Sequence, residues 1–217
     1  MKLYISDLHF YHENVIALDK RNFCDVKDMN AYMISQWNSK IKGGDQIYVL
    51  GDMFVTKEAK EVNFILNRLN GKIFLVEGNH DCVWLKKEGV NLNRFEWIKP
   101  YAEITDGNSN VILSHYPTFC YNHQYLQKSD GSPKTFMLYG HVHNTHDEVL
   151  VNQFQILTQK TELLGSTGTR KINCNMINCF CGFSDYKPLS LKEWIETDSI
   201  RRKNLKIPAD QKIADEM

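Results

Sequence analysis

Residues 136–146, FMLYGHVHNTH, join an apolar run to three of the eight histidines of the chain. The apolar run at 136–139 is typical of a buried strand, and Gly140 allows a sharp turn after it. An exposed turn does not need three imidazoles, and a buried core rarely holds them without partners. The stretch therefore predicts a strand that ends at a site, provided that other strands end in the same way.

Four other apolar segments also end in Gly or Ser and then present Asp, Asn or His. The five strand ends carry these groups: Ser6 before Asp7 and His9, Gly51 before Asp52, Gly78 before Asn79, His80 and Asp81, Ser114 before His115, and Gly140 before His141 and His143. The carboxyl ends of the strands in an α/β sheet border one crevice, so we expect these groups to lie together. Carboxylates and imidazoles crowded in a crevice require cations to neutralise them. Ligands of this kind, without cysteine, indicate Mn, Fe, Zn, Co or Ni, and their number indicates two ions.

Hydrophobic periodicity and turn residues predict the elements around these strand ends. Strands are expected at 2–6, 46–50, 72–77, 96–104, 111–114 and 135–139, with one or two more in 172–183, and helices at 28–41, 57–69, 82–88, 148–164 and 190–196. Helices that alternate with buried strands, followed by a strand-rich middle, predict an α/β domain with a mixed, two-sheet core. We expect a single domain at residues 1–200 and a polar tail at 201–217.

The composition is that of a folded protein without a dominant charge. Hydrophobic residues make up 42% of the chain, and 26 basic residues balance 26 acidic ones. Zero net charge disfavours non-specific binding to nucleic acid or to a membrane surface. The N-terminus is too polar for a signal peptide, and no apolar stretch reaches the roughly 18 residues of a transmembrane helix. A cytoplasmic location is therefore expected.

The six cysteines form no CxxC pair and are expected to be free thiols. Three of them lie in the segment 172–183, INCNMINCFCGF, where a zinc site is an alternative. The alternation of this segment is more typical of buried cysteines in a strand.

The five strand ends together resemble the signature of the calcineurin-like metallophosphoesterases: Asp7-Leu8-His9, Gly51-Asp52, Gly78-Asn79-His80-Asp81, His115 and Gly140-His141-Val142-His143. The resemblance covers residues 2 to about 146. Residues 185–191, DYKPLSL, are also similar to the C-terminal strand of the small, capless bacterial and phage members. The resemblance implies an α/β/β/α sandwich, in which two mixed sheets packed face to face are flanked by helices.

The resemblance also implies a dinuclear centre of two divalent transition-metal ions, with manganese as the first candidate. Seven residues would be its ligands: Asp7, His9 and His143 for one ion, Asn79, His115 and His141 for the other, and Asp52 as the bridge. A hydroxide that bridges the ions would attack phosphorus. His80 would contact the phosphate or protonate the leaving group, and Asp81 would orient His80 or raise its pKa.

Three residues near these motifs are candidates for substrate binding: His12, Asn14 and Tyr116. His12 would alternatively bond a metal ligand or face water. The aromatic residues after His115 are more typical of a loop packed on its own domain than of a surface that stacks on a nucleobase. We expect Arg21 and residues 201–203 to be surface charges, and His146 to face solvent or support a ligand.

The expected activity is hydrolysis of phosphate monoesters or diesters. The motifs are not separated by a long insertion, which predicts an open site for a small phosphorylated substrate, possibly a nucleotide. One alternative is a nuclease or a protein phosphatase, although zero net charge makes a nuclease less attractive. Another is a non-catalytic metal-binding scaffold, against which the intact His9, His80, His141 and His143 count.

Overall fold

Two four-stranded sheets form the centre of the computed structural model, which describes residues 1–165, 168–171 and 174–204. The first sheet is wholly parallel and consists, in spatial order, of β1 (Lys2–Ile5), β2 (Gln46–Leu50), β3 (Lys72–Val76) and β4 (Phe95–Lys99). The second consists, in spatial order, of β10 (Met176–Asn178), β7 (Thr135–Tyr139), β6 (Ser109–Ser114) and β5 (Tyr101–Asp106). Only β5 runs antiparallel to its neighbour, so the second sheet is mixed.

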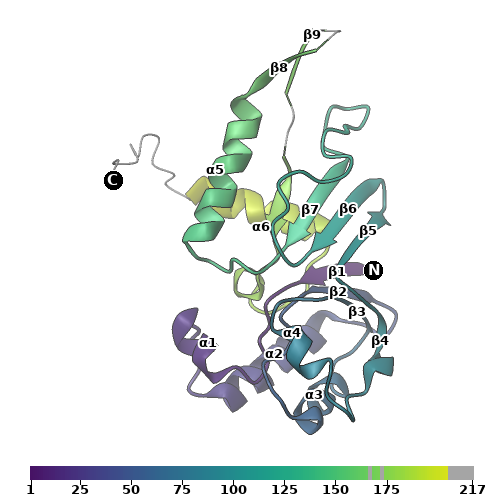
Figure 1. Ribbon diagram of the computed structural model, residues 1–217, viewed down its shortest axis with the longest axis vertical. Coiled ribbons are helices and arrows are strands. Elements are labelled where there is room, and N and C mark those ends of the chain that lie inside the picture. Colours follow the sequence, from purple (N-terminus) through teal and green to yellow (C-terminus); the bar gives the residue numbers. More distant parts are fainter. Residues whose placement is uncertain (166–167, 172–173, 205–217) are drawn as a thin grey trace.

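Helices cover the outer faces of the two sheets (Figure 1). The first sheet is covered by α1 (Glu13–Leu18), α2 (Val26–Lys40), α3 (Ala59–Leu66) and α4 (Asp81–Trp84), and the second by α5 (His146–Lys160). The last helix, α6 (Leu191–Asn204), contacts β1 and β10. The predicted α/β/β/α sandwich is confirmed, with the correction that the first sheet is wholly parallel rather than mixed.

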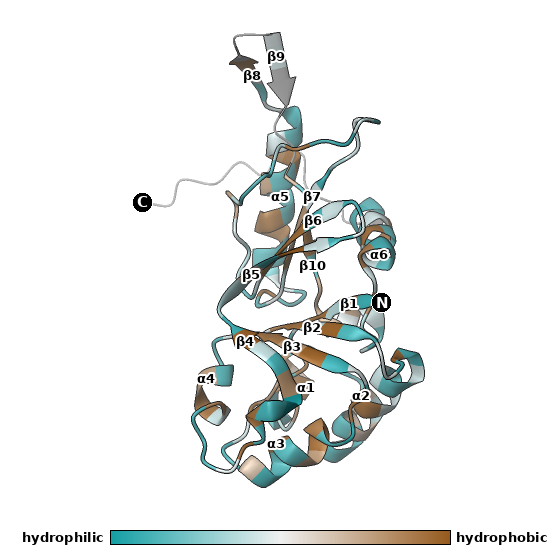
Figure 2. Cartoon of the chain, turned by 90° about the vertical axis from the view of Figure 1, so that its right-hand side faces the viewer, coloured by the Kyte–Doolittle hydropathy of each residue, from teal (hydrophilic) through white to brown (hydrophobic). Residues whose placement is uncertain are grey.

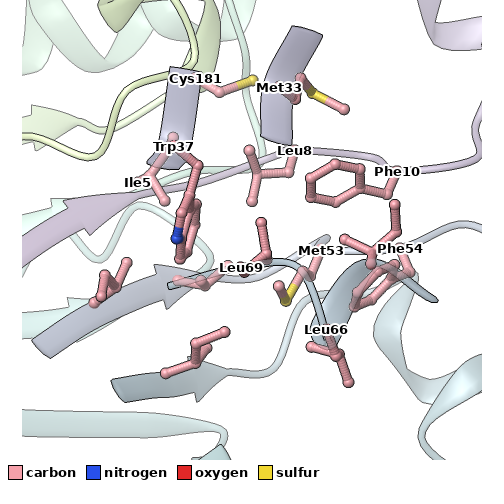
Figure 3. Close-up of a cluster of buried hydrophobic side chains, with 14 of the residues drawn as sticks. Ile5, Leu8, Phe10, Met33, Trp37, Met53, Phe54, Leu66, Leu69 and Cys181 are labelled. Carbon is pink, nitrogen blue, oxygen red and sulfur yellow. The ribbon is translucent and has the colours of Figure 1, made fainter. Parts of the chain in front are cut away.

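Alternation along the strands divides the core into layers. In β1, Leu3 and Ile5 belong to the cluster on the helix side of the first sheet, whereas Tyr4 belongs to the cluster between the sheets. Figure 3 shows Met33 and Trp37 in the helix-side cluster with Ile5, and Figure 2 shows hydrophobic residues gathered on the central strands. Because β1, β2 and β3 are largely buried on both faces, these strands are continuous apolar runs after their first residue, whereas the edge strand β4 carries the exposed Glu96.

The helix predicted at 148–164 is too long. α5 ends at Lys160, and Thr161 adopts an extended conformation. The chain then forms a hairpin of β8 (Glu162–Gly165) and β9 (Gly168–Lys171), which projects from the domain (Figure 1). The periodicity does not reveal this boundary, because a short apolar run fits both a helix and a strand.

The single strand predicted at 96–104 is two strands in different sheets. β4 ends at Lys99 and β5 begins at Tyr101, with Pro100 between them. Proline lacks a backbone N–H and cannot continue the ladder of a central strand. Pro100 therefore marks the crossing between the two sheets.

Three expectations for the C-terminal part need correction. Residues 185–191 form no strand, and of these only Leu189 pairs, through an isolated bridge to Tyr4. α6 continues to Asn204, into the segment predicted as a tail, and residues 205–217 lie outside the described residues. Arg201 and Arg202 are not free surface charges, because both pair with Asp198, at 2.7 Å and 2.5 Å.

Two further findings concern the cysteines and the membrane. Cys174, Cys179 and Cys181 are buried free thiols, as expected. In the segment 172–183, the strand β10 occupies residues 176–178. Residues 172–173 lie outside the described residues. In the part of the chain that the structure describes, no helix has the length and hydropathy needed to cross a bilayer.

Candidate metal centre

The loops that follow β1, β2, β6 and β7 meet at one edge of the sandwich. The N–H of Asp7 donates to the carbonyl of Gly51 at 3.1 Å, which joins the loops after β1 and β2. Gly140 donates in the same way to His115 at 2.9 Å, which joins the loops after β6 and β7. The N–H of His141 donates to Oδ1 of Asp7 at 3.0 Å. The two sheets therefore contribute to one site.

Five of the seven predicted metal ligands have a left-handed backbone conformation. Their φ angles are 55° for Asp7, 54° for His9, 52° for Asp52, 70° for His141 and 46° for His143. This conformation is uncommon for a residue with a Cβ atom, and such strain costs on the order of 1–3 kcal/mol per residue. Its recurrence at one place indicates that the surrounding structure holds these side chains in a required direction.

Glycines allow two of the strand ends to approach their neighbours closely. A Cβ atom on Gly51, which has a φ of +88°, would lie 2.3 Å from Nδ1 of His115. A Cβ atom on Gly78 would lie 2.3 Å from Oδ1 of Asp52. Both positions must therefore be glycine for these ligands to keep their places.

The first group of donor atoms comes from Asp7, His9 and His143. Nε2 of His9 lies 3.1 Å from Nε2 of His143, and Oδ1 of Asp7 lies 3.6 Å from the same Nε2. Burial lowers the pKa of His9 well below its ordinary value, which favours the neutral ring that a metal ligand needs. Ring nitrogens and a carboxylate that face one point attract a cation to it. The first group therefore fits a metal ion.

The carboxylate of Asp19 orients His143 within this group. Nδ1 of His143 lies 2.7 Å from Oδ1 of Asp19, which directs Nε2 toward Asp7 and His9. Burial acts to lower the pKa of His143, but the bonds to Asp19 and Asp7 raise it to about 9. Asp19 and Asp7 thus stabilise positive charge at this place, and a metal ion bound to Nε2 would replace the proton of the ring.

The second group of donor atoms comes from Asn79, His115 and His141. Oδ1 of Asn79 lies 2.9 Å from Nε2 of His115 and 2.9 Å from Nδ1 of His141. Nδ1 of His115 lies 2.9 Å from the carbonyl of Leu50 and donates to it, so Nε2 presents its lone pair to the group. An amide oxygen and two imidazole nitrogens that converge in this way also fit a metal ion.

Asp52 lies between the two groups. Its Oδ2 is 3.7 Å from Nε2 of His9 in the first group and 3.5 Å from Nε2 of His115 in the second. Its Oδ1 accepts a hydrogen bond from the N–H of His80 at 2.8 Å, which fixes the carboxylate. One oxygen therefore faces both groups, as a bridging ligand must.

Arg21 was expected at the surface but is buried beneath the first group. Its guanidinium donates to the carbonyls of Asp7 at 3.0 Å and Leu8 at 2.9 Å, and to Oδ2 of Asp19 at 2.8 Å. Burial alone would raise the pKa of Asp19, but the bond to His143 and the charge of Arg21 hold it below its ordinary value. Asp19 and Arg21 were missed as site residues because both lie in a loop with no motif around them.

The comparison with protein families identifies the group to which the chain belongs. The model of the calcineurin-like phosphoesterase superfamily domain matches residues 1–158, well over half of the chain. The chain belongs to the calcineurin-like phosphoesterase superfamily. This membership supports a hydrolase role, and a centre for divalent metal ions is typical of the superfamily.

Three proteins to which the chain is similar come from an archaeon, a phage and a bacterium. The uncharacterized protein MJ1445 of Methanocaldococcus jannaschii is 29% identical over 192 residues, which are 88% of this chain and 87% of the relative. The gene 66 protein of Mycobacterium phage L5 is 24% identical over 65% of this chain and 76% of its own length. The crystal structure of the protein of unknown function AQ665 from Aquifex aeolicus has a TM-score of 0.61 and 26% identity, over 90% of this chain and 98% of that one.

Asp81, which was predicted to orient His80 or raise its pKa, has its hydrogen-bond partners elsewhere in this member of the superfamily. Asp81 is fully buried and accepts four hydrogen bonds, from the backbone N–H groups of Asp52 at 2.8 Å, Met53 at 2.9 Å and Gly78 at 2.8 Å, and from the indole of Trp84 at 2.8 Å. Burial raises its pKa, against the effect of these bonds. Asp81 therefore holds the loops after β2 and β3 together, and its side chain forms no hydrogen bond with the ring of His80 in the described structure.

We predict that Asp81→Ala is strongly destabilising. It would leave four N–H donors without an acceptor, three of them buried, and one such buried group costs about 1–3 kcal/mol. The free energy of unfolding, measured with urea, should fall by at least about 3 kcal/mol. Asp147→Ala, at an exposed position of α5, is the control and should stay within about 0.5 kcal/mol of the wild type. A similarly small effect of Asp81→Ala would contradict this assignment.

His80 borders the two groups of donor atoms but does not belong to the predicted ligand set. Its side chain is 44% exposed, and its Nε2 lies 4.0 Å from Oδ2 of Asp52. The His80 ring lies 5.4 Å from the ring of His9 and 5.9 Å from that of His12. His80 thus has the access to a substrate that Asp81 lacks.

The other candidate residues are placed in different ways. Nδ1 of His12 lies 3.2 Å from Nδ1 of His9, so His12 contacts a candidate ligand. The ring of Tyr116 is half exposed and lies 4.5 Å from that of His141, at the mouth of the site. Asn14 is exposed on α1, and His146 is exposed at the start of α5. Neither has a recorded side-chain contact with the described residues of the site.

Proposed function

We propose that this protein is a dinuclear metal-dependent hydrolase of phosphate esters. The position of Asp52 carries the proposal, because its Oδ2 lies 3.7 Å from His9 in the first group and 3.5 Å from His115 in the second. Each group contributes three donors and shares Asp52, which would give each ion four protein ligands. The absence of cysteine from the two groups favours Mn, with Fe, Zn, Ni and Co as alternatives.

The two ions, when bound, would lower the pKa of a water molecule and polarise the phosphoryl group. His80 can exchange a proton with the substrate, because it is partly exposed beside Asp52 and does not belong to the ligand set. The hydrogen bond from its own N–H to Oδ1 of Asp52, at 2.8 Å, fixes its backbone relative to the bridging carboxylate. His80 would therefore protonate the leaving oxygen or bind a phosphoryl oxygen.

The exposure of the site supports a small substrate. The side chain of His80 is 44% exposed, and Tyr116 is 49% exposed beside His141. The Tyr116 ring offers an aromatic face next to the metal centre, which suits a nucleotide as well as a simple phosphate ester. Either a diester or a monoester would fit this arrangement.

The test is hydrolysis of a chromogenic phosphodiester and of the matching monoester. The protein is first treated with a chelator, and Mn²⁺ or Ni²⁺ is then added back while metal binding is measured by calorimetry. We expect about two metal equivalents and metal-dependent cleavage of at least one ester. Binding of less than one equivalent without cleavage would reject the proposal. Two bound equivalents with cleavage only of a nucleic acid or a phosphoprotein would favour a macromolecular substrate.

A further inference from the structure

β10 provides a sixth strand end at the site. It runs parallel to β7, and its last residue, Asn178, pairs in register with Tyr139, directly before the Gly140-His141-Val142-His143 loop. Asn178 is 1% exposed. Its position follows the rule of the five predicted strand ends, but it is preceded by Ile177 rather than by Gly or Ser.

The side chain of Asn178 is linked to His143 directly and through Phe180. Its Nδ2 donates to the carbonyl of His143 at 2.8 Å. Its Oδ1 accepts from the N–H of Phe180 at 3.0 Å, and the ring of Phe180 stacks on the imidazole of His143 at 4.8 Å and 18°. One buried amide therefore fixes both the backbone and, through Phe180, the ring plane of a candidate metal ligand.

A buried carboxylate in turn holds Asn178. Glu148 of α5 is 2% exposed, and its Oε2 accepts from Nδ2 of Asn178 at 3.1 Å and from the hydroxyl of Tyr139 at 2.6 Å. Its Oε1 pairs with Nη2 of Arg201 in α6 at 2.5 Å. A continuous chain of polar contacts thus runs from α6 through α5 to the backbone of His143.

We propose that Asn178 is a positioning residue for the metal site formed by Asp7, His9 and His143, and that the Glu148–Arg201 pair holds it in place. The inference rests on the proposed function, since it concerns the affinity of that site for a metal ion. Asn178, Phe180 and Arg201 lie beyond residues 1–158, which the family model matches. The C-terminal segment is therefore part of the support of the metal centre.

The left-handed backbone of His143 explains why such support is needed. A φ of 46° is strained for a residue with a Cβ atom, and it persists only where surrounding contacts hold it. The hydrogen bond from Asn178 to the carbonyl of His143 is such a contact. Loss of this bond would let the loop relax, and Nε2 of His143 would turn away from Asp7 and His9.

The test compares metal binding by the wild type, Asn178→Ala and Asn152→Ala, measured by calorimetry with Mn²⁺. Asn152 is a matched control because it is fully buried and donates to Oε1 of Glu148 at 3.1 Å, yet bonds nothing in the His143 loop among the described residues. We expect Asn178→Ala to weaken one of two metal equivalents by about 10- to 100-fold and Asn152→Ala to leave both unchanged. Equal weakening in both variants would indicate a general loss of structure and overturn the proposal.

A second substitution and a double-mutant cycle keep the test decisive. Phe180→Leu removes the stacked ring but keeps an apolar side chain, and it should weaken the same ion by a smaller factor. In a His143→Ala background, Asn178→Ala should not weaken the remaining ion further, because positioning acts through His143. Wild-type affinity in whichever of the Asn178 and Phe180 variants folds, or further weakening in the His143→Ala background, would overturn the proposal.

The outcome also separates this inference from the proposed function. A wild-type protein that binds less than one equivalent of Mn²⁺ would overturn both. Two equivalents in the wild type, together with unchanged affinities in Asn178→Ala, would overturn the positioning role of Asn178 alone.

Discussion

Replacing His80 with alanine should leave metal binding intact and lower turnover by about 10²- to 10⁴-fold. The imidazole of His80 is partly exposed, and its Nε2 lies 4.0 Å from Asp52, outside both groups of donor atoms. Its removal takes away a proton donor and a contact for the phosphoryl group, but no predicted ligand. The measurements are kcat for the better of the two chromogenic esters and the number of Mn²⁺ equivalents bound.

The matched control for this substitution is His146→Ala. His146 lies in the same stretch as His141 and His143, but it is exposed at the start of α5, and its loss should leave kcat and metal binding unchanged. Turnover of the His80 variant at the wild-type rate would remove His80 from the mechanism. Loss of a metal equivalent in that variant would instead identify His80 as a ligand. The geometry allows this role, because His9, Asp52 and His80 together form a group that could hold a metal ion.

The meeting of the seven donors at one edge could be predicted because each follows a strand at its carboxyl end, whereas their choice as ligands followed from the family resemblance. A buried strand is visible as an apolar run, and the residue after it has little choice of position, since parallel strands end at one edge. The structure brings Asp7, His9, Asp52, Asn79, His115, His141 and His143 together in that way. The shared position of these residues could therefore be predicted from local sequence and sheet geometry.

The supporting residues could not be predicted in the same way. Asp19 and Arg21 lie in a loop after a helix of six residues, and their contacts to His143 and Asp7 arise only through tertiary packing. Asp81 was assigned to its neighbour in the sequence, His80, although its partners are the backbone of the loop after β2, the N–H of Gly78 and Trp84. Two residues that are adjacent in a motif, such as His80 and Asp81, can therefore be predicted to lie in the same region, but not to form a hydrogen bond with each other.

Asn178 shows an intermediate case. The segment 172–183 was expected to be strand-like. A polar residue at the end of such a strand could therefore have been predicted to lie at the site, like those at the other strand ends. The prediction for this segment concerned its cysteines, which were expected to be buried, with a zinc site as the alternative. The side chain that reaches the candidate centre is instead Asn178, between Ile177 and Cys179. Knowledge that β10 pairs in parallel with β7 decides the point, and that pairing joins segments almost forty residues apart.

Replacing Asp52 with asparagine should weaken metal binding at both groups of donor atoms. Asparagine has nearly the same shape, and its Oδ1 can still accept the N–H of His80, so the fold should be kept. The substitution replaces the oxygen that lies 3.7 Å from His9 and 3.5 Å from His115 with an uncharged amide nitrogen. That nitrogen donates hydrogen bonds and has no lone pair to offer a cation. We expect fewer than two Mn²⁺ equivalents and a loss of turnover on the order of 10³-fold.

The response to added metal separates this variant from the His80 variant. If Asp52→Asn fails because its ions are weakly bound, millimolar Mn²⁺ should restore part of its turnover, whereas no concentration of metal should restore His80→Ala. Asp147→Asn, at an exposed position, controls for the loss of one negative charge and should bind two equivalents as the wild type does. Two tightly bound equivalents in Asp52→Asn would contradict a bridging role, because a carboxylate shared by two cations cannot be replaced by a neutral amide without loss of affinity at both.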